Sequence, residues 1–568
     1  MNDLLPLRAV VLLAVAGTAV LSGCHEDHPF FLETNKNTRL PVERLRSLEK
    51  LDIQTYKKPE QQQQTAADEL RKRFDSLATY DISIEAARVS VLVNNLDLKV
   101  QLFAPTIASQ SVSEEEARFE STFTTRVAVN DFDSPTSSSL SSAQSRSFTV
   151  TPGVRTPLVT GGTINVELPV GQSRNNNSFS TLNPASTADL QFSISQPLLR
   201  GAGRRANTAG IRIAQYNQQV TEARTKLEAI RQLAAIDRAY WRLYRARKEL
   251  EVAQQQYELA NVQLERARRR VAADTAAEIE TVRAEAGLAQ RLETIIVAQN
   301  NILQAQREFK RVLNLPGLTV DTATVIQLST QPDPVEYLFN RDELVIKALS
   351  LRMEMLQTEL QLAADAATIG LEKNRALPLL SLDYTYRING LGGSTQDAFH
   401  LLKQNNFEDW QVGLNLEVPL GNEAARSRVR RAILERLQKL ASKDQQQLAI
   451  RQEVLNAIDE LDTGWQRILA ARQSTALSTR SLRAEERQFS VGLSTSTNVL
   501  DASTRLAESQ FAEIRAITDY QTAQVDLAFA TGTLLGAAKV DWQPVTQPDP
   551  QIFYPPPEEK IADPGTAK

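Results

Sequence analysis

The sequence contains few of the residues from which catalytic and metal centres are usually built. Its 568 residues include one cysteine and three histidines, and no histidine has the cysteine, histidine and acidic neighbours typical of a metal site. A single cysteine excludes a disulfide within the chain. No phosphate-binding loop or nucleophile elbow is present. We therefore expect no metal, no cofactor and no enzymatic activity.

An excess of one charge and long apolar runs are also missing. Lysine and arginine number 64 and acidic residues number 68, so no overall field draws the chain to nucleic acid. The cluster Arg266, Arg268, Arg269 and Arg270 is better interpreted as a charged helix face than as a nucleic-acid patch. After residue 20 no apolar run approaches the roughly 20 residues of a membrane helix, which excludes a helical membrane bundle.

The N-terminus has the features of a secretion signal. Arg8 precedes an apolar run over residues 9–20, which is too short to span a bilayer and suits the apolar region of a signal peptide. Leu21, Ser22, Gly23 and Cys24 follow and resemble the lipobox of bacterial lipoproteins, in which the cysteine becomes the acylated first residue. His25 replaces the aspartate of many inner-membrane lipoproteins, which implies an outer-membrane anchor. The alternative is an ordinary cleavage site beside an incidental thiol.

The chain carries two copies of one unit. The segment Val271–Gln290 is similar to Val491–Gln510, about 220 residues later, and the segments before each of them also correspond in order. Each copy is expected to begin with a helical segment, over 84–101 and 342–373, followed by strands and helices. The expected organisation is a signal peptide (1–23), a flexible tether (24–75), a first repeat (76–315), a linker (316–340), a second repeat (341–537) and a proline-rich tail (538–568).

The strands are predicted from an alternation of apolar and polar residues with a period of two. This alternation covers 119–130 and 190–195 in the first copy and 380–389 and 412–418 in the second. Runs of about ten residues suit tilted transmembrane strands, although a half-buried sheet of a soluble protein alternates in the same way. Four strands cannot enclose a lumen, so several chains must contribute, and three would supply twelve. An additional strand pair is indicated near 145–170, and the sequence leaves open whether it crosses the membrane.

After the strands the period changes to that of helices. No proline interrupts 204–270 or 423–490, and at about 1.5 Å per residue each helix would be on the order of 100 Å long. Within the predicted return helices, large and small apolar residues alternate in a heptad pattern over 295–312 and 516–534, as knobs-into-holes packing requires. A coiled-coil stalk would contain the same helices without the strands.

Together these segments resemble the TolC family of outer-membrane efflux proteins from about Ile84 to Gly536. The most specific motifs are QPLLRG from Gln196, LPLLSL from Leu377 and VGLSTSTNVLDASTRL from Val491. The resemblance implies an α+β trimeric channel-tunnel with a shared 12-stranded outer-membrane β-barrel and a long periplasmic α-helical coiled-coil barrel. It implies a homotrimer in contact with outer-membrane lipids, with a periplasmic adaptor protein and an inner-membrane pump as partners. The function would be passive export in tripartite efflux or type I secretion.

The resemblance also assigns roles to the turns between the long and the return helices. In the family these turns are the tips that dock the adaptor, through a valine-glycine pair. Ala272 departs from this pattern in the first turn, and the alternative is that both turns are plain helix-turn-helix corners. The residues concerned are Val271 and Thr275 in the first tip and Val491, Gly492, Leu493 and Thr495 in the second.

Acidic residues just inside the tips are expected to form rings at the tunnel entrance. Asp501 matches a family aspartate, Asn498 replaces another, and Glu278 stands at the place in the first copy that corresponds to Asn498. Such rings would attract cations. The alternative is ordinary solvated surface. For the whole chain, the main rival is a non-conducting periplasmic scaffold lipoprotein, which needs no amphipathic strands.

Overall fold

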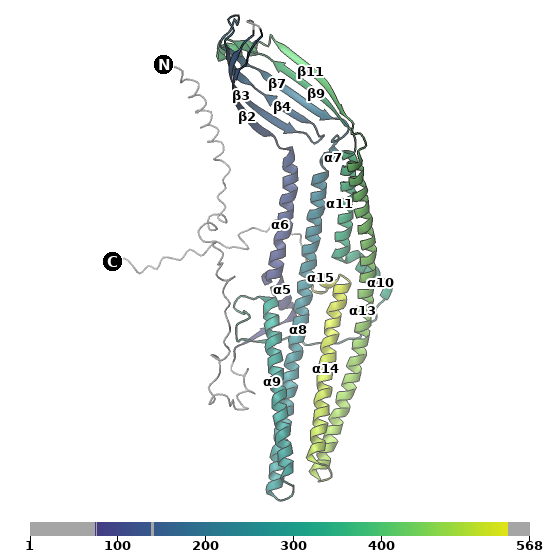
Figure 1. Cartoon of the computed structure of the whole chain (residues 1–568). Coiled ribbons are helices and arrows are strands. Elements are labelled where there is room, and N and C mark those ends of the chain that lie inside the picture. Colours follow the sequence, from purple (N-terminus) through teal and green to yellow (C-terminus); the bar gives the residue numbers. More distant parts are fainter. Residues whose placement is uncertain (1–73, 75–76, 138–140, 543–568) are drawn as a thin grey trace, which may run out of the picture. The chain divides into compact units, whose positions relative to one another are not determined.

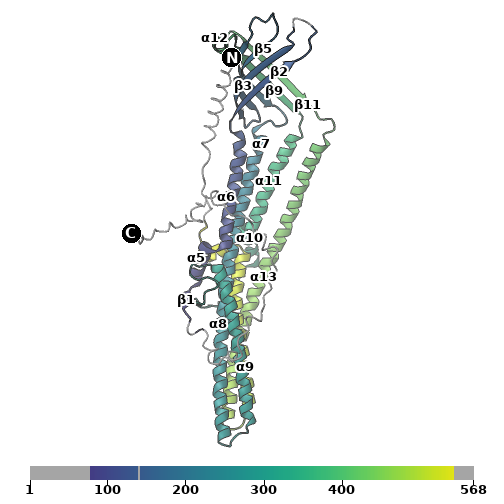
Figure 2. The same ribbon diagram turned by 60° about the vertical axis from the view of Figure 1, so that its left-hand side comes forward.

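The computed structural model describes residues 74, 77–137 and 141–542 (Figures 1 and 2). The predicted signal peptide, Cys24, nearly all of the tether and the tail beyond 542 lie outside these residues. The described part repeats one order of elements, in which two helices lead to strands, a long helix and a return helix. Among the described helices, none combines the length and the apolar character that crossing a membrane requires.

The first helix of each copy is interrupted at a corresponding place. Asn95 separates α5 (Ile84–Asn94) from α6 (Leu96–Glu116), and Arg352 separates α10 (Arg341–Leu351) from α11 (Met353–Arg375). Both residues have extended backbone, with φ −63° and ψ 127° at Asn95 and φ −68° and ψ 129° at Arg352. The sequence pattern predicted no interruption here.

Both interrupting side chains are buried and hydrogen-bonded. The Asn95 side chain accepts a hydrogen bond from the Leu98 N–H (2.9 Å) and donates one to the Val312 carbonyl (2.9 Å). Arg352 donates to Glu354 (2.8 Å) and to Glu453. These contacts satisfy polar groups that would otherwise be costly to bury, and they tie the first helices to the long hairpins.

A single antiparallel sheet combines strands of both copies. Its order is β10-β6-β5-β3-β4-β7-β9-β11, with β2 on the free side of β3. The strands are β2 (Thr122–Asp133), β3 (Gln144–Pro157), β4 (Thr163–Glu167), β5 (Val170–Asn175), β6 (Ala185–Ala188), β7 (Leu190–Pro197), β9 (Leu379–Ile388), β10 (Leu391–Gly392) and β11 (Glu408–Glu417). The four predicted strand segments and the additional pair are all present. The predicted start at Phe119 was wrong, because Ala117–Phe119 forms a 3-10 turn before β2.

In two places, consecutive strands of this sheet form one longer strand with a short gap in its pairing. The gap between β4 and β5 holds Leu168 and Pro169, and Asp189 separates β6 from β7. The Leu168 N–H donates to the Pro152 carbonyl of β3 (2.9 Å), and the Asp189 N–H donates to the Pro169 carbonyl (3.0 Å). The chain therefore stays in the sheet over 163–175 and 185–197. Counted in this way, the sheet consists of six long strands.

Two long helical hairpins follow the strands. In the first, α8 (Ala209–Ala272) packs against α9 (Ile279–Leu313), and in the second, α13 (Glu423–Ser490) packs against α14 (Ser496–Ala530). The predicted heptad positions are all buried, which confirms the predicted packing. These positions are Ile295, Ala298, Ile302, Ala305, Phe309 and Val312 in α9, and Ala516, Tyr520, Ala523, Leu527, Ala530 and Leu534 in and after α14.

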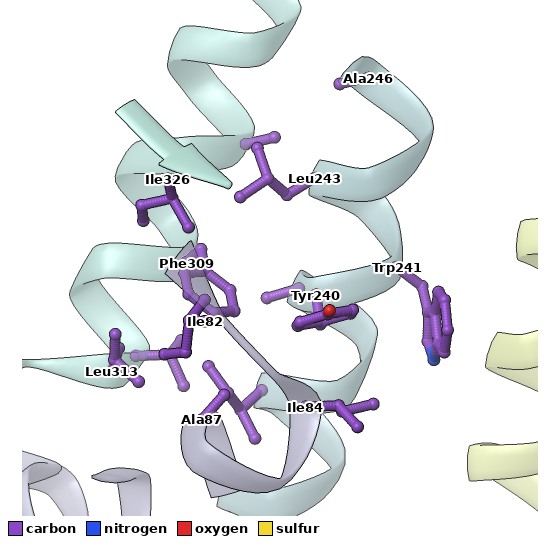
Figure 3. Close-up of a cluster of buried hydrophobic side chains, with 14 of the residues drawn as sticks. Ile82, Ile84, Ala87, Tyr240, Trp241, Leu243, Ala246, Phe309, Leu313 and Ile326 are labelled. Carbon is purple, nitrogen blue, oxygen red and sulfur yellow. The ribbon is translucent and has the colours of Figure 1, made fainter. Parts of the chain in front are cut away.

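The segment expected to be a linker contributes to the core of the first copy. Its strand β8 (Val325–Leu328) pairs in parallel with β1 (Thr79–Ile82), and neither strand was predicted. Ile82 and Ile326 face Phe309 and Tyr240 of the first hairpin (Figure 3). The Tyr240 and Phe309 rings are 6.2 Å apart at an angle of 61°, an edge-to-face contact. This core joins the first long hairpin, α8 and α9, to the segment between the two repeats.

Candidate functional site

The two faces of the sheet differ in polarity, as the pairing of residues between neighbouring strands shows. One row of paired residues crosses all six long strands, and every member is apolar or aromatic. From edge to edge the row is Trp410, Tyr386, Phe192, Val166, Val154 and Phe123. Side chains in one such row lie on the same face of a sheet. The sheet therefore has one apolar face that extends over its whole width.

The neighbouring row points to the opposite face and is polar throughout. It consists of Gln411, Thr385, Ser193, Asn165, Arg155 and Thr122. On this face Ser195 donates a hydrogen bond to Asp383 (2.5 Å), and Arg387 donates to Gln191 (2.7 Å). A sheet with one apolar and one polar face is suited to separate lipid from water.

Both edges of the sheet are open. Within the described residues, β2 pairs only with β3 and β11 pairs only with β9. Large apolar side chains on these edge strands are highly exposed, among them Phe123 (69%) and Trp410 (69%). An open edge presents unpaired N–H and carbonyl groups, which a further strand can satisfy. One chain thus supplies a segment of wall with two edges that accept neighbours.

The second tip ends in a regular helix cap. Gly492 has φ +80°, and its N–H donates to the Phe489 carbonyl while the Leu493 N–H donates to the Gln488 carbonyl. This pair of bonds is the Schellman motif, which requires a left-handed residue and favours glycine. Thr495 then caps α14 by accepting a hydrogen bond from the Asn498 N–H (3.4 Å).

At this corner the exposed surface is apolar. Val491 is 69% exposed and Leu493 is 81% exposed. Neither side chain is needed for the cap, because the cap uses backbone groups and the freedom of Gly492. Two exposed apolar side chains at a hairpin end are suited to contact another protein.

The first tip has the same cap, two residues later than the sequence alignment suggested. Asp274 takes the left-handed position with φ +52°, its N–H donates to the Val271 carbonyl, and the Thr275 N–H donates to the Arg270 carbonyl. Val271 and Ala272 still belong to α8. Asp274, rather than Ala272, is therefore the structural counterpart of Gly492. Aspartate tolerates this conformation, so no glycine marks the position in the sequence.

The two hairpins contact each other near their ends. An added Cβ at Gly287 would lie 3.4 Å from the side chain of Leu500, and the Arg270 guanidinium lies 4.9 Å from the Phe489 ring centroid. Arg268 pairs with Glu265 and Glu285, as expected for a charged helix face. The sequence analysis did not single out Phe489, because its flanking residues Gln488 and Ser490 are polar and form no apolar period with it.

The acidic candidates lie at different heights along the hairpins. Gly287 and Leu500 mark one level, and Glu278 precedes Gly287 by nine residues whereas Asp501 follows Leu500 directly. At about 1.5 Å per residue, these ten residues place Glu278 roughly 15 Å closer to the tip than Asp501. Glu278 also lies closer to the tip than Asn498 does. The two repeats therefore do not place Glu278 and Asn498 at equivalent heights.

All three candidate entrance residues are exposed. Asn498 donates a hydrogen bond to Ser494 (3.2 Å). No ion pair or side-chain hydrogen bond involves Glu278 or Asp501 within the described ranges. Among the same residues there is no group of three histidine, cysteine, aspartate or glutamate side chains that could hold a metal ion.

Comparisons with known proteins agree on one type of molecule. Residues 344–533 match the family described as outer membrane efflux protein. The outer membrane protein TolC of Vibrio cholerae is 24% identical over 307 residues, which cover 53% of this chain and 67% of that protein.

Solved structures of outer-membrane channels have the same fold. The channel OprN superposes with a TM-score of 0.58 at 18% identity, over 85% of this chain and 96% of OprN. The CmeC channel of Campylobacter jejuni superposes with a TM-score of 0.58 at 14% identity, over 79% of this chain and 86% of CmeC. The amphipathic sheet and the two long hairpins are thus a fold that this chain shares with these channels. The chain is therefore similar to outer membrane efflux proteins of the TolC type, through the family match over residues 344–533 and the likeness to TolC.

Proposed function

We propose that three copies of this chain assemble into a passive export duct of a tripartite efflux or type I secretion system. The observation that carries the proposal is the sheet, which has one apolar face, one polar face and two open edges. A single copy cannot enclose a lumen, whereas neighbouring copies joined edge to edge can. The apolar face would then contact lipid and the polar face would line the exit.

The long hairpins would continue the duct into the periplasm. At about 1.5 Å per residue, the 64 residues of α8 and the 68 residues of α13 would reach on the order of 100 Å. Within one chain, the two hairpins already pack side by side through α8 and α14. A periplasmic scaffold lipoprotein would need these helices but not the apolar sheet face, and for this reason we favour a duct.

Single-channel recording in planar bilayers tests this function. We expect the purified full-length protein to run as an SDS-resistant trimer and to give stable, long-lived conductance. A monomer that never conducts would overturn the proposal. The cargo is not specified by the duct, because in such systems selection lies with the partner pump.

We further propose that the second tip docks a periplasmic adaptor through Val491, Gly492, Leu493 and Thr495. The exposed apolar pair at the corner supports this role. For the first tip, with Val271 and Thr275 around Asp274, the corner is small and polar, so we expect a weaker contribution to docking.

Replacement of Leu493 by serine should weaken cross-linking to the adaptor while the amount of trimer stays unchanged. Leu338, which is 98% exposed in the segment between the repeats, provides a matched control, and Leu338→Ser should leave cross-linking intact. Equal cross-linking by both variants would contradict docking at this tip.

The carboxylates of Glu278 and Asp501 are proposed to form two acidic rings in the trimer, at separate heights, with Asn498 between them. Threefold symmetry would bring three like charges together at each level and so attract cations. Cys24 is proposed to carry the lipid anchor, and incorporation of radiolabelled palmitate into the wild type, but not into Cys24→Ala, would test that assignment.

A further inference from the structure

The first repeat is longer than the second, and the excess lies in the sheet. Asp274 lies 179 positions after Asn95, whereas Gly492 lies 140 positions after the corresponding Arg352, a difference of 39. The helices do not account for it, because α6 and α11 have 21 and 23 residues and α8 and α13 have 64 and 68. The additional residues therefore belong to the strands between α6 and α8.

The additional residues form a strand pair inside the sheet. It consists of β3 and the continuous strand β4–β5, joined by a short turn in which the Gly161 N–H donates to the Leu158 carbonyl (2.8 Å). β3 pairs over twelve residues with β2, and β4 and β5 pair with β7 and β6. The pair thus lies between β2 and the remaining strands and does not project from them.

Over β4 and the part of β3 that pairs with it, the inserted pair shares the polarity of its neighbours. Val154 and Val166 belong to the apolar row that includes Phe192, and Arg155 and Asn165 belong to the polar row that includes Ser193. Farther along β3, Phe148 and Val150 pair with Val129 and Val127 of β2 on the same apolar face. A strand pair that projected into water would have no reason to keep this alternation in register.

We propose that β3 and β4–β5 cross the outer membrane together with the other four long strands. The inference rests on the proposed trimeric duct. Six strands from each of three chains would close a barrel of eighteen strands, rather than the twelve that the family resemblance implies. Barrel diameter grows roughly linearly with strand number, so at equal strand tilt this barrel would be about 1.5 times as wide. Size selection would then lie in the helical part of the duct.

Spin labels on single introduced cysteines distinguish lipid from water at each position. Cys24 is the only native cysteine, so the protein without an introduced cysteine gives the background. In phospholipid vesicles, accessibility to oxygen reports lipid, and accessibility to the nickel complex Ni(II)-EDDA reports water. We expect labels at Val154 and Val166 to favour oxygen, and labels at Arg155 and Asn165 to favour the nickel complex.

Labels at Phe192 and Ser193 on the neighbouring strand are the matched controls, and they separate the two possible failures. If Phe192 favours oxygen while Val154 and Val166 favour the nickel complex, the inserted pair lies outside the membrane and the inference is wrong, although the duct stands. If Phe192 also favours the nickel complex, the outer-membrane duct itself is refuted, and the inference with it.

Disulfide cross-linking provides an independent test of the wall. If the pair belongs to the barrel, β2 is the edge that meets β11 of the next copy. A cysteine at Val127 combined with a cysteine at Val412, Leu414 or Leu416 should give covalent dimers and trimers under oxidising conditions. A cysteine at Ile194, on the interior strand β7, should give none with the same partners. Absence of cross-linked trimers for every Val127 combination would contradict the eighteen-stranded barrel.

Discussion

The ion pair between Arg88 and Asp237 joins the first helix to the long hairpin, and its loss should be strongly destabilising. Two hydrogen bonds of 2.8 Å connect the guanidinium to the two carboxylate oxygens, and the Asp237 side chain is fully buried. Removing one partner of such a pair leaves an uncompensated buried charge. Arg88→Ala should therefore lower the free energy of unfolding by about 3–5 kcal/mol per copy at neutral pH.

The unfolding free energy lost in Arg88→Ala should increase as the pH rises. Burial raises the pKa of the Asp237 carboxyl, although the hydrogen bonds and charge of Arg88 act to lower it. A raised pKa in the folded state means that stability from this group is present below its unfolded pKa of about 3.9 and is lost as the pH rises through the folded value. Without Arg88 the pKa rises further, so the deficit of Arg88→Ala should grow between about pH 4 and pH 7.

Urea unfolding followed by circular dichroism at several pH values measures both effects. Arg341 offers a matched control, because its pair with Asp459 is more than half exposed on both sides and should contribute at most about 1 kcal/mol. The double variant Arg88→Met with Asp237→Leu should recover most of the stability. A loss below about 1 kcal/mol in Arg88→Ala, or an equal loss at pH 4 and pH 7, would refute the reasoning.

Three further predictions concern the core, the tip and the entrance. Phe309→Ala should cost about 3–5 kcal/mol by opening a cavity beside Tyr240, measured by the same unfolding assay; a loss under about 1 kcal/mol would contradict the packing. Gly492→Ala places a side chain at φ +80° and should cost about 1–2 kcal/mol locally, visible as faster amide exchange around the second tip and absent in Gly370→Ala within α11. Asp501→Asn combined with Glu278→Gln should weaken block of the single-channel current by polyvalent cations, and unchanged block would exclude these residues from the entrance.

The sequence was most informative where one physical pattern persists over many residues. The heptad positions from Ile295 to Val312 and the alternation from Leu380 to Ile388 predicted the packing of α9 and the strand β9 correctly. The first segment buries one side of a helix, and the second keeps its apolar residues on one face of a strand, so each pattern persists long enough to establish a period. The motif beginning at Val491 carried the family resemblance for the same region.

Shorter or locally determined features could not be predicted in this way. β1 and β8 have four residues each, too few to establish a period. The interruptions at Asn95 and Arg352 depend on buried partners that are distant in the sequence.

The inserted strand pair was only partly recognised. Serine, threonine and glycine weaken its alternation, and Pro152 and Pro169 interrupt its ladder. Its place in the sheet became evident only from the register with β2 and β7.

The most direct test of the account is electron cryomicroscopy of the purified full-length protein in lipid nanodiscs. We expect three copies around a threefold axis, with the sheets joined into one barrel and the hairpins continuing it as a hollow cylinder. A single copy with its sheet closed upon itself in water, or helices wound around a solid axis without a lumen, would contradict the account.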